Sequence, residues 1–331
     1  MIWIKKEKIV ATVADFYLDT IALGLTKAGK EVKAIYEWDE MQYQPGDRVV
    51  VIGATRAMEL WGKKIPYYYW AQGIWPEESY LRYGSRARQW AQSQLEKRAL
   101  KQAEFVFFVS DAMKKHFEKK YKLQFDGKCY IMPCANEQLH SEAFSTPGKY
   151  ENNVFCYAGG LSQWQCFEET VALYAKIEAA RPDSRLLLLV KEKDQALQML
   201  QKYAVKNYSI DYVPIEQLPQ ALAQAKFGFV IRSASPINAV ATPTKIVTYL
   251  CNGLIPIYSH TLSGIREMLA GAKTPICYQN DGDITKILSV MDRDLPAKEV
   301  QSDLEAVYQK AYRRQRHVEQ IAAHFQAQLG R

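Results

Sequence analysis

The sequence predicts an α/β protein made of two doubly wound domains, each with a largely parallel sheet. Short apolar runs alternate with helical stretches along nearly all of the 331 residues, and this alternation is typical of parallel sheets with helical crossovers. The length suffices for two domains of ordinary size. Hydrophobic residues make up 48% and charged residues 24% of the chain, which argues against disorder.

Six strands are expected in each half, with helices between them. In the first half, strands are expected at 8–14, 31–38, 48–52, 66–72, 105–109 and 129–133, and helices at 17–28, 55–61, 76–103 and 111–120. In the second half, strands are expected at 154–157, 185–190, 209–213, 227–231, 254–258 and 275–278, followed by a polar helical tail at 300–329. Ser110 is expected to cap the helix that follows it, because its hydroxyl can accept from a free backbone N–H.

The segment 142–153 (EAFSTPGKYENN) is rich in turn residues and is the best candidate for a linker. We therefore place the domain boundaries at 1–148 and 149–305, with a terminal helix at 306–331. Two lobes joined in this way are expected to face a cleft, and ligands usually bind in such clefts.

The segment 227–257 (FGFVIRSASPINAVATPTKIVTYLCNGLIPI) combines a strand, a polar loop, a helix and another strand. Arg232 leaves the carboxyl end of the strand, and Lys245 lies in the first turn of the helix, for which Thr242 is a plausible N-cap. Ligands bind outside the carboxyl ends of parallel strands, and helix N-termini attract anions. The pair therefore indicates a nucleotide-diphosphate site. The alternatives are a structural carboxylate partner for Arg232 and a solvated Lys245.

A second loop, 158–164, follows the first strand of the second half and contains Gly159 and Gly160. Adjacent glycines allow backbone to approach a ligand closely, and the helix beyond supplies N–H donors. A plain strand-to-helix turn would have the same composition. The chain contains no Walker sequence and no complete G-x-G-x-x-G, which argues against a kinase or a dehydrogenase.

Candidate residues in the first half also follow predicted strands. Asp15 is a candidate base or acceptor-orienting group, although a helix N-cap is an equally good interpretation. Gln72 and Gly73 precede Glu77, whose alternative role is that of an ordinary acid in a first helical turn. The six cysteines are scattered without C-x-x-C spacing, so we expect no metal site.

The net charge of +7 arises from one segment, because residues 82–128 contain 12 basic and five acidic residues. Aromatic residues are interleaved with these charges. Such a face can dock on anionic lipid or on nucleic acid, or it can be a solvated helix surface. No apolar run approaches the ~20 residues of a membrane-spanning helix, and the amino-terminal residues lack a signal-peptide pattern. We expect a cytoplasmic protein, with peripheral association at the inner face of the cell membrane as an option.

These motifs resemble those of GT-B glycosyltransferases of family four. The donor-site pattern of one subgroup falls on Arg232, Asn238, Thr242-Pro243-Thr244-Lys245, Tyr249-Leu250, Gly253 and Pro256. Residues 157–164 (YAGGLSQW) are similar to the family's Y-x-G-x-L-S-x-W. In the first half, 73–78 (GIWPEE) and 108–113 (FVSDAM) resemble acceptor-domain segments of the same subgroup.

The chain departs from this family at four positions. The family's phosphate-binding Arg and Lys in the first loop are replaced by Gly160 and Gln165, and its E-x7-E pair falls on Val240 and Thr248. Thr248 can hydrogen-bond one ribose hydroxyl but cannot accept from two in the way a glutamate does. Arg232 and Lys245 would then carry more of the phosphate recognition.

The resemblance implies a GT-B glycosyltransferase with an acceptor-binding first domain, a nucleotide-sugar-binding second domain and a terminal helix that packs back on the first. It would transfer a sugar from a nucleotide-sugar to a saccharide or lipid-linked acceptor in bacterial surface polysaccharide biosynthesis. No metal or other cofactor and no nucleic acid partner are expected. The donor residues implied are Gly159, Gly160, Ser162, Asn238, Thr244 and Thr248, with Arg232, Lys245 and Asp15 catalytic and Gln72, Gly73 and Glu77 binding acceptor. The alternative is a non-catalytic GT-B-like subunit that binds a glycan or a partner.

Overall fold

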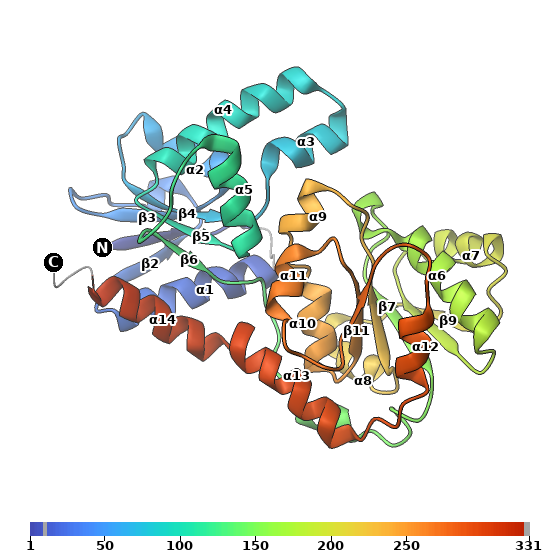
Figure 1. The fold of residues 1–331 in the computed structure, drawn as a ribbon. Coiled ribbons are helices and arrows are strands. Elements are labelled where there is room, and N and C mark those ends of the chain that lie inside the picture. Colours follow the sequence, from blue (N-terminus) through green and yellow to red (C-terminus); the bar gives the residue numbers. More distant parts are fainter. Residues whose placement is uncertain (9–11, 328–331) are drawn as a thin grey trace. The chain divides into compact units, whose positions relative to one another are not determined.

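The computed structural model describes residues 1–8 and 12–327 (Figure 1). It divides into two compact units. The first unit comprises Met1–Asn136, Ala239–Thr242 and the chain from Ala311 onward, and the second comprises Glu137–Asn238 and Pro243–Lys310. The segment at 142–153 that resembles a linker lies wholly within the second unit, where Phe144, Lys149 and Tyr150 are buried.

The first unit is built on a parallel six-stranded sheet with the order β2-β1-β3-β4-β5-β6. Its strands are β1 (Ile2–Lys5), β2 (Val32–Ile35), β3 (Arg48–Ile52), β4 (Tyr67–Ala71), β5 (Phe105–Phe108) and β6 (Cys129–Ile131). Strands β4 and β5 are buried along their whole length, which explains why they are continuous apolar runs without alternation.

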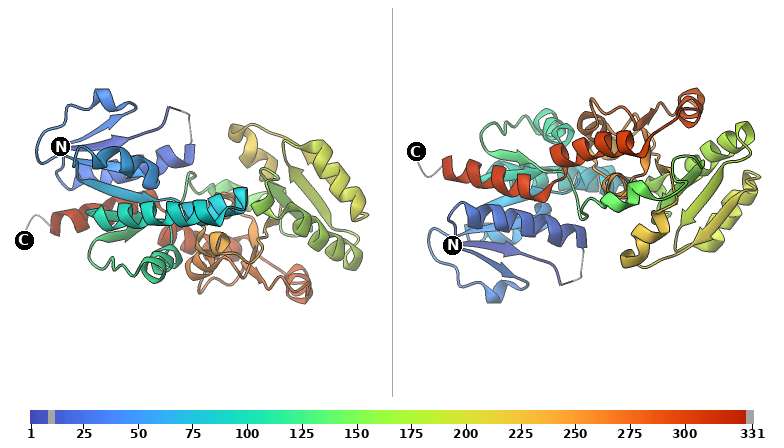
Figure 2. Two further views of the ribbon diagram at one scale, coloured as in Figure 1. Left: turned by 90° about the horizontal axis from the view of Figure 1, so that it is seen from above. Right: turned by 90° about the horizontal axis from the view of Figure 1, so that it is seen from below.

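The helices of the first unit are α1 (Thr12–Lys27), α2 (Gly53–Trp61), α3 (Trp75–Tyr83), α4 (Arg86–Gln102), α5 (Asp111–Tyr121) and α14 (Arg314–Ala327). Helix α14 lies along α1, as the right-hand view in Figure 2 shows. Gly24 of α1 is the point of close approach, because a Cβ there would meet Ile321 Cγ2 at 2.6 Å. The Ser110 cap is confirmed, since its Oγ accepts from Met113 N at 3.0 Å.

Two predictions for the first unit were wrong. The strand expected at 8–14 is instead β1 at Ile2–Lys5, and Thr12 onward is helical; residues 9–11 of that prediction lie outside the described residues. The helix expected at 76–103 is two helices, α3 and α4. Gly84 separates them, because its φ of 65° is a left-handed conformation that ends α3.

The second unit contains another parallel six-stranded sheet, ordered β12-β11-β10-β7-β8-β9. Its strands are β7 (Val154–Ala158), β8 (Arg185–Leu189), β9 (Tyr208–Asp211), β10 (Phe227–Val230), β11 (Ile255–Ser259) and β12 (Ile276–Tyr278). This is the strand order of a dinucleotide-binding sheet, in which the chain leaves the first strand toward one edge and returns from the fourth toward the other. The switch point lies between β7 and β10.

The helices that accompany this sheet are α6 (Phe167–Ala180), α7 (Lys193–Lys202), α8 (Leu218–Leu222), α10 (Thr244–Cys251), α11 (Ser263–Met268), α12 (Thr285–Met291) and α13 (Ala297–Ala311), with a short α9 (Pro236–Val240) in the loop after β10. The polar tail predicted as one helix is therefore α13 and α14. Among the described residues, no helix is long and apolar enough to cross a bilayer.

Each sheet is covered by its own apolar core. In the first unit, Tyr17 of α1 stacks on Trp70 of β4 with ring centroids 4.0 Å apart. In the second, the ring of Phe155 stacks on Phe227 and Phe229 across the β7–β10 pair. Burial of each such ring stabilises the fold by about 1.5–3 kcal/mol, so the strand ends that carry polar residues project from rigid platforms.

Candidate functional site

The switch point of the second sheet brings together the two loops that the sequence singles out. Strands β7 and β10 are paired in parallel, so their carboxyl ends lie side by side. Gly159 and Gly160 follow β7, and Arg232 follows β10. In open α/β sheets, ligands bind at this crevice because the two connecting loops diverge there and leave backbone groups exposed.

Arg232 is almost completely buried and has neutral partners. Its guanidinium donates to Gln165 O at 2.9 Å, to Gln165 Oε1 at 2.5 Å and to the carbonyl of Ile231 at 2.9 Å. Its backbone is tied to Ser259 and Asn280. Among the described residues it forms no ion pair with a carboxylate. The alternative of a structural carboxylate partner is therefore wrong, and the positive charge of Arg232 is uncompensated.

Lys245 lies beside this arginine with its amine buried and unpaired. Its Nζ has no hydrogen-bond partner among the described residues and lies 3.7 Å from the centroid of the Tyr157 ring. Burial, and then the charge of Arg232, lower its pKa well below 10.5. The alternative of a solvated lysine is wrong. A buried amine next to a second cation is costly, and an anion that enters the site would relieve this cost.

The glycine loop is shaped by Lys245. Gly159 has a φ of +125°, and a Cβ at this position would lie 2.8 Å from Lys245 Cε. At Gly160 a Cβ would meet nothing within 4 Å, and its carbonyl accepts from the Tyr157 hydroxyl at 2.7 Å. Gly159 is thus required by both its backbone and its neighbour, whereas Gly160 leaves room over the loop.

Helix α10, which carries Lys245, is fixed to the sheet by Tyr249. The Tyr249 hydroxyl accepts from the Ala158 backbone N–H at 3.0 Å, and its ring covers Gly228, where a Cβ would be only 2.4 Å from Tyr249 Cδ2. The N-cap prediction was wrong by one residue. Pro243 occupies the cap position, and the Thr242 hydroxyl instead accepts from Cys134 N in the first unit.

The opposite end of α10 is held by the segment that precedes β7. The backbone N–H of His140 donates to Cys251 O at 2.9 Å, Lys149 Nζ to Asn252 O at 2.7 Å and the Tyr150 hydroxyl to Gly253 O at 2.8 Å. These are carbonyls that a helix C-terminus leaves without intrahelical partners. Lys149 is 1% exposed, and burial lowers its pKa to about 7.

The other predicted donor residues lie nearby but are partly engaged. Asn238 donates to Ser233 O at 2.9 Å and thereby closes its own loop. Thr244 is the first residue of α10, and Ser162 precedes a short 3-10 helix without capping it through its side chain. Thr248 lies beside the carboxyl group of Glu137. Burial raises the pKa of Glu137, and hydrogen bonds from Asn252 and Thr248 only partly oppose this effect. The sequence did not single out Glu137, and it identified Gln165 only as a departure from the family pattern, not as a partner of Arg232.

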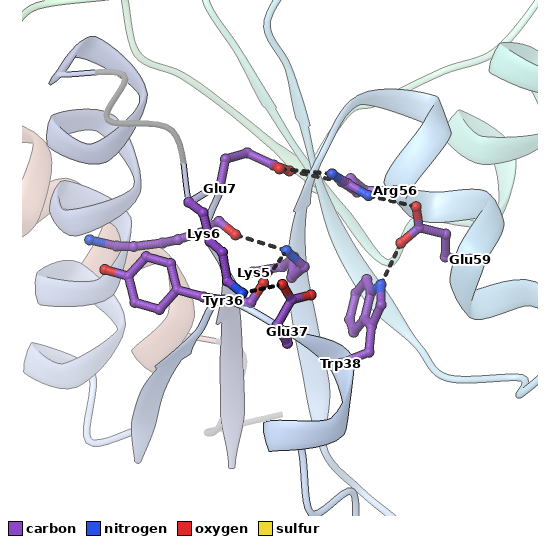
Figure 3. A network of polar contacts seen from close by, with 9 residues as sticks. Lys5, Lys6, Glu7, Tyr36, Glu37, Trp38, Arg56 and Glu59 are labelled. Carbon is purple, nitrogen blue, oxygen red and sulfur yellow. Dashed lines mark hydrogen bonds and ion pairs between the residues drawn. The ribbon is translucent and has the colours of Figure 1, made fainter.

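The switch point of the first sheet, between β1 and β3, is occupied by ion pairs (Figure 3). Arg56 of α2 makes two bonds to Glu7, at 2.8 and 2.7 Å, and a third to Glu59. Lys5 donates to Tyr36 O at 2.8 Å. Opposite charges are satisfied here within the protein. At the switch point of the second sheet, by contrast, Arg232 and Lys245 have no carboxylate partner within residues 1–8 and 12–327.

The candidate residues of the first unit are engaged in local contacts. Asp15 lies on α1 with its carboxylate 3.7 Å from Lys6 Nζ, so it is not an N-cap. Gln72 and Gly73 directly follow β4. Glu77 is in the first turn of α3 and forms an ion pair with Lys120 of α5 at 2.7 Å. Among the described residues, no cluster of three or more His, Cys, Asp or Glu side chains is placed to hold a metal ion.

Comparisons with known proteins establish the fold. No protein-family model and no curated protein sequence matches the chain. Among solved structures, sucrose-phosphate synthase from Thermosynechococcus elongatus superposes with a TM-score of 0.67 at 14% identity over 99% of both chains. Anabaena HepE, solved with UDP and glucose, superposes with a TM-score of 0.66 at 13% identity over 99% of this chain and 98% of its own.

A Staphylococcus aureus TarM mutant, solved with fondaparinux, α-GlcNAc-glycerol and UDP, superposes with a TM-score of 0.63 at 9% identity. The match covers 84% of this chain but only 55% of the TarM chain. Two six-stranded parallel sheets with flanking helices and these likenesses confirm the predicted two-domain GT-B glycosyltransferase fold.

Proposed function

We propose that this protein is a glycosyltransferase that binds the diphosphate of a nucleotide-sugar between Arg232, Lys245 and the glycine loop. The observation that carries the proposal is the buried pair of Arg232 and Lys245 at the β7–β10 switch point, to which the part of the chain that the structure describes contributes no carboxylate. A diphosphate supplies the missing negative charge and accepts bidentate bonds from arginine. The structural neighbours solved with UDP add support for a uridine diphosphate as the first ligand to test.

In the proposed reaction, an acceptor hydroxyl forms the new glycosidic bond and gives its proton to a base, for which Asp15 is the proposed candidate. The bond between the sugar and the diphosphate breaks, and the nucleoside diphosphate leaves with its electron pair. Arg232 and Lys245 neutralise the negative charge that grows on the leaving diphosphate, and the N-terminus of α10 and the Gly159–Gly160 backbone add donors. Two side-chain cations in this way provide the positive charge for which other sites use a metal ion. Asp15, Gln72, Gly73 and Glu77 of the first unit are the proposed acceptor residues. The proposed setting is bacterial surface polysaccharide assembly.

The test is calorimetric titration with UDP. We expect Arg232→Ala to weaken binding at least tenfold, about 1.4 kcal/mol, because a charge-assisted bidentate contact is lost. Lys206→Ala, an exposed lysine of the same unit, is the matched control and should bind like the wild type. Equal affinities of the wild type and Arg232→Ala for UDP would refute the proposed phosphate site.

A second candidate is a non-catalytic subunit that retains the fold. It is favoured by Thr248 and Gln165, which replace charged residues of the family pattern. Slow hydrolysis of a nucleotide-sugar in a panel of donors is expected of an active transferase. If the protein bound UDP but neither hydrolysed any donor nor transferred a sugar from one, the non-catalytic subunit would be favoured.

We also propose that the protein acts at the cytoplasmic face of the membrane through the hairpin of α3 and α4. Residues 79–95 contain three arginines and no acid. Leu81, Tyr83 and Trp90 on this hairpin are 46%, 54% and 68% exposed, and Arg88 covers the Tyr83 ring at 4.1 Å. Basic residues beside exposed aromatic rings suit an anionic bilayer surface, at about 1 kcal/mol for each basic residue.

Sedimentation with liposomes tests this surface. We expect stronger binding to anionic than to neutral vesicles and release by salt. Trp90→Ser should weaken the binding several-fold, while Trp164→Ser, which removes another exposed tryptophan in the second unit, should not. Equal binding to both vesicle types would show that the hairpin is an ordinary solvated surface. Binding to random duplex DNA would instead indicate a nucleic-acid-binding surface.

A further inference from the structure

A carboxyl group lies fully buried in the first unit, whereas the proposed diphosphate site belongs to the second. Glu96 of α4 has no exposed surface. Its Oε1 accepts from the backbone N–H of Trp75 at 3.1 Å, and its Oε2 accepts from the Tyr121 hydroxyl at 2.6 Å. Lys120 Nζ lies 3.8 Å from Oε2. Polar groups are rarely buried without a specific partner, so the contacts of Glu96 indicate what it is there to hold.

The Trp75 N–H lies at the start of α3, within the segment 72–78 that comprises the short connection after β4 and the first turn of α3; this segment is called loop 72–78. A second carboxyl, that of Glu78, accepts from the neighbouring Ile74 N–H at 3.1 Å. Gly73 makes room for it, because a Cβ there would lie 2.1 Å from Glu78 Oε1. Two consecutive N–H groups of this loop are therefore bound by carboxyl groups, one from α3 and one from α4.

Lys120 links Glu96 to the exposed side of the loop. Its Nζ is 2.7 Å from Glu77 Oε1 and 3.8 Å from Glu96 Oε2. Glu77 is one of the proposed acceptor residues. The carboxylate of Glu77 and the carboxyl group of Glu96 both lie near the Lys120 amine, so Lys120 couples Glu96 to Glu77.

We propose that Glu96 is a positioning residue that holds loop 72–78 in one conformation through the Trp75 N–H and Lys120. The inference rests on the proposed function only in that Gln72, Gly73 and Glu77 of this loop are the proposed acceptor site. Replacement of Glu96 loosens the first-unit loop and leaves the diphosphate site of the second unit unchanged.

The burial of Glu96 gives the loop a pH dependence. Burial raises the pKa of Glu96 to about 8, against the lowering contacts of Tyr121 and Lys120. The titratable groups around it are Tyr121 and Lys120 on α5, Glu77 on α3 and Tyr69 on β4. A group whose folded pKa is raised stabilises at low pH, and this contribution is lost as pH rises through the folded pKa. Local opening of the loop is therefore easier above pH 8 than at pH 6.

The experiment is amide hydrogen exchange of peptides covering 72–78, corrected for intrinsic rates, together with calorimetry of UDP binding. In Glu96→Ala we expect protection of these peptides to fall at least about tenfold, because the Trp75 N–H loses its partner. Glu96→Gln keeps an oxygen for Trp75 N and should restore most of the protection. Glu118→Gln, an exchange on α5 away from the loop, is the matched control.

The pH series distinguishes positioning from general support. Protection in the wild type should fall by up to about tenfold per pH unit between pH 6 and 8, and it should be flat in Glu96→Gln. Unchanged protection in Glu96→Ala would overturn the proposal, as would equal pH dependence in the wild type and Glu96→Gln. If Glu96→Ala lost UDP affinity together with loop protection, the claim that Glu96 acts only within the first unit would be wrong. Failure of the wild type to bind UDP would refute the proposed function and leave the loop result intact.

Discussion

Lys245 leads to a prediction about protons as well as affinity. Its amine is buried against the Tyr157 ring without a hydrogen-bond partner among the described residues, and its pKa is well below 10.5. A diphosphate at this site favours the charged amine, so binding should raise the pKa of Lys245 and draw in a proton. We expect uptake of up to one proton for each UDP bound at pH 8, where the terminal phosphate is already fully ionised because its second pKa is about 6.

The size of the effect follows from two opposing contributions. A hydrogen bond from an ammonium to a phosphate contributes about 1.5–3 kcal/mol. Protonation of the amine costs about 1.4 kcal/mol for each pH unit above its free-state pKa. We therefore expect Lys245→Met to weaken UDP binding at least tenfold near neutral pH, and the wild-type affinity to decline as pH rises, by at most tenfold per unit.

Calorimetry in buffers of different ionisation enthalpy measures the proton uptake directly as a slope. The slope should show net proton uptake for the wild type and for the Lys206→Met control, and it should be near zero for Lys245→Met. A zero slope in a wild type that binds UDP well would show that Lys245 does not change its protonation. Equal affinities of Lys245→Met and the wild type would show that it does not contact the phosphates.

Two further predictions concern the surroundings of this site. Gly159→Ala should weaken UDP binding and destabilise the fold by about 1–3 kcal/mol, because a φ of +125° and the nearby Lys245 both oppose a Cβ; Gly160→Ala, where a Cβ has room, should do neither, and calorimetry with thermal unfolding measures both. Lys149 has a folded pKa of about 7, below that of the unfolded chain, so its contribution to stability should rise with pH above 7, by at most about 1.4 kcal/mol per unit. The difference in denaturant stability between the wild type and Lys149→Met at pH 7, 8 and 9 should show this rise, and a constant difference would contradict it.

The strands and the two cations were predictable because both depend on local patterns. Apolar runs that end in a charged or glycine-rich loop mark the carboxyl ends of parallel strands, and Arg232 and Gly159 are placed correctly on that basis alone. Lys245 could be assigned to a first helical turn because Pro243 precedes it. The start of the first unit was misassigned because β1 has only four residues, and the longer apolar stretch that follows it is more typical of a strand.

Side-chain partners distant in the sequence could not be predicted. Gln165 lies 67 residues from Arg232, and only the pairing of β7 with β10 brings their loops together. Lys149 lies in a segment of turn residues, where a lysine is normally exposed, and its burial depends on the C-terminal carbonyls of α10. Glu96 belongs to a strongly basic segment, and nothing in its neighbours indicates that it faces the β4–α3 loop.

In the proposed diphosphate site, Gln165 already occupies the hydrogen-bond donors of Arg232 that an incoming diphosphate would use. The backbone carbonyl and the side-chain amide oxygen of Gln165 both accept from the guanidinium of Arg232, so an incoming anion has to displace these bonds. A neutral amide is a weak rival for a dianion, and it keeps the arginine aligned until the exchange takes place. A glutamate at position 165 would form an ion pair with Arg232 and would prevent the arginine from binding a diphosphate. Because glutamine is neutral, an incoming anion can replace its hydrogen bonds to Arg232.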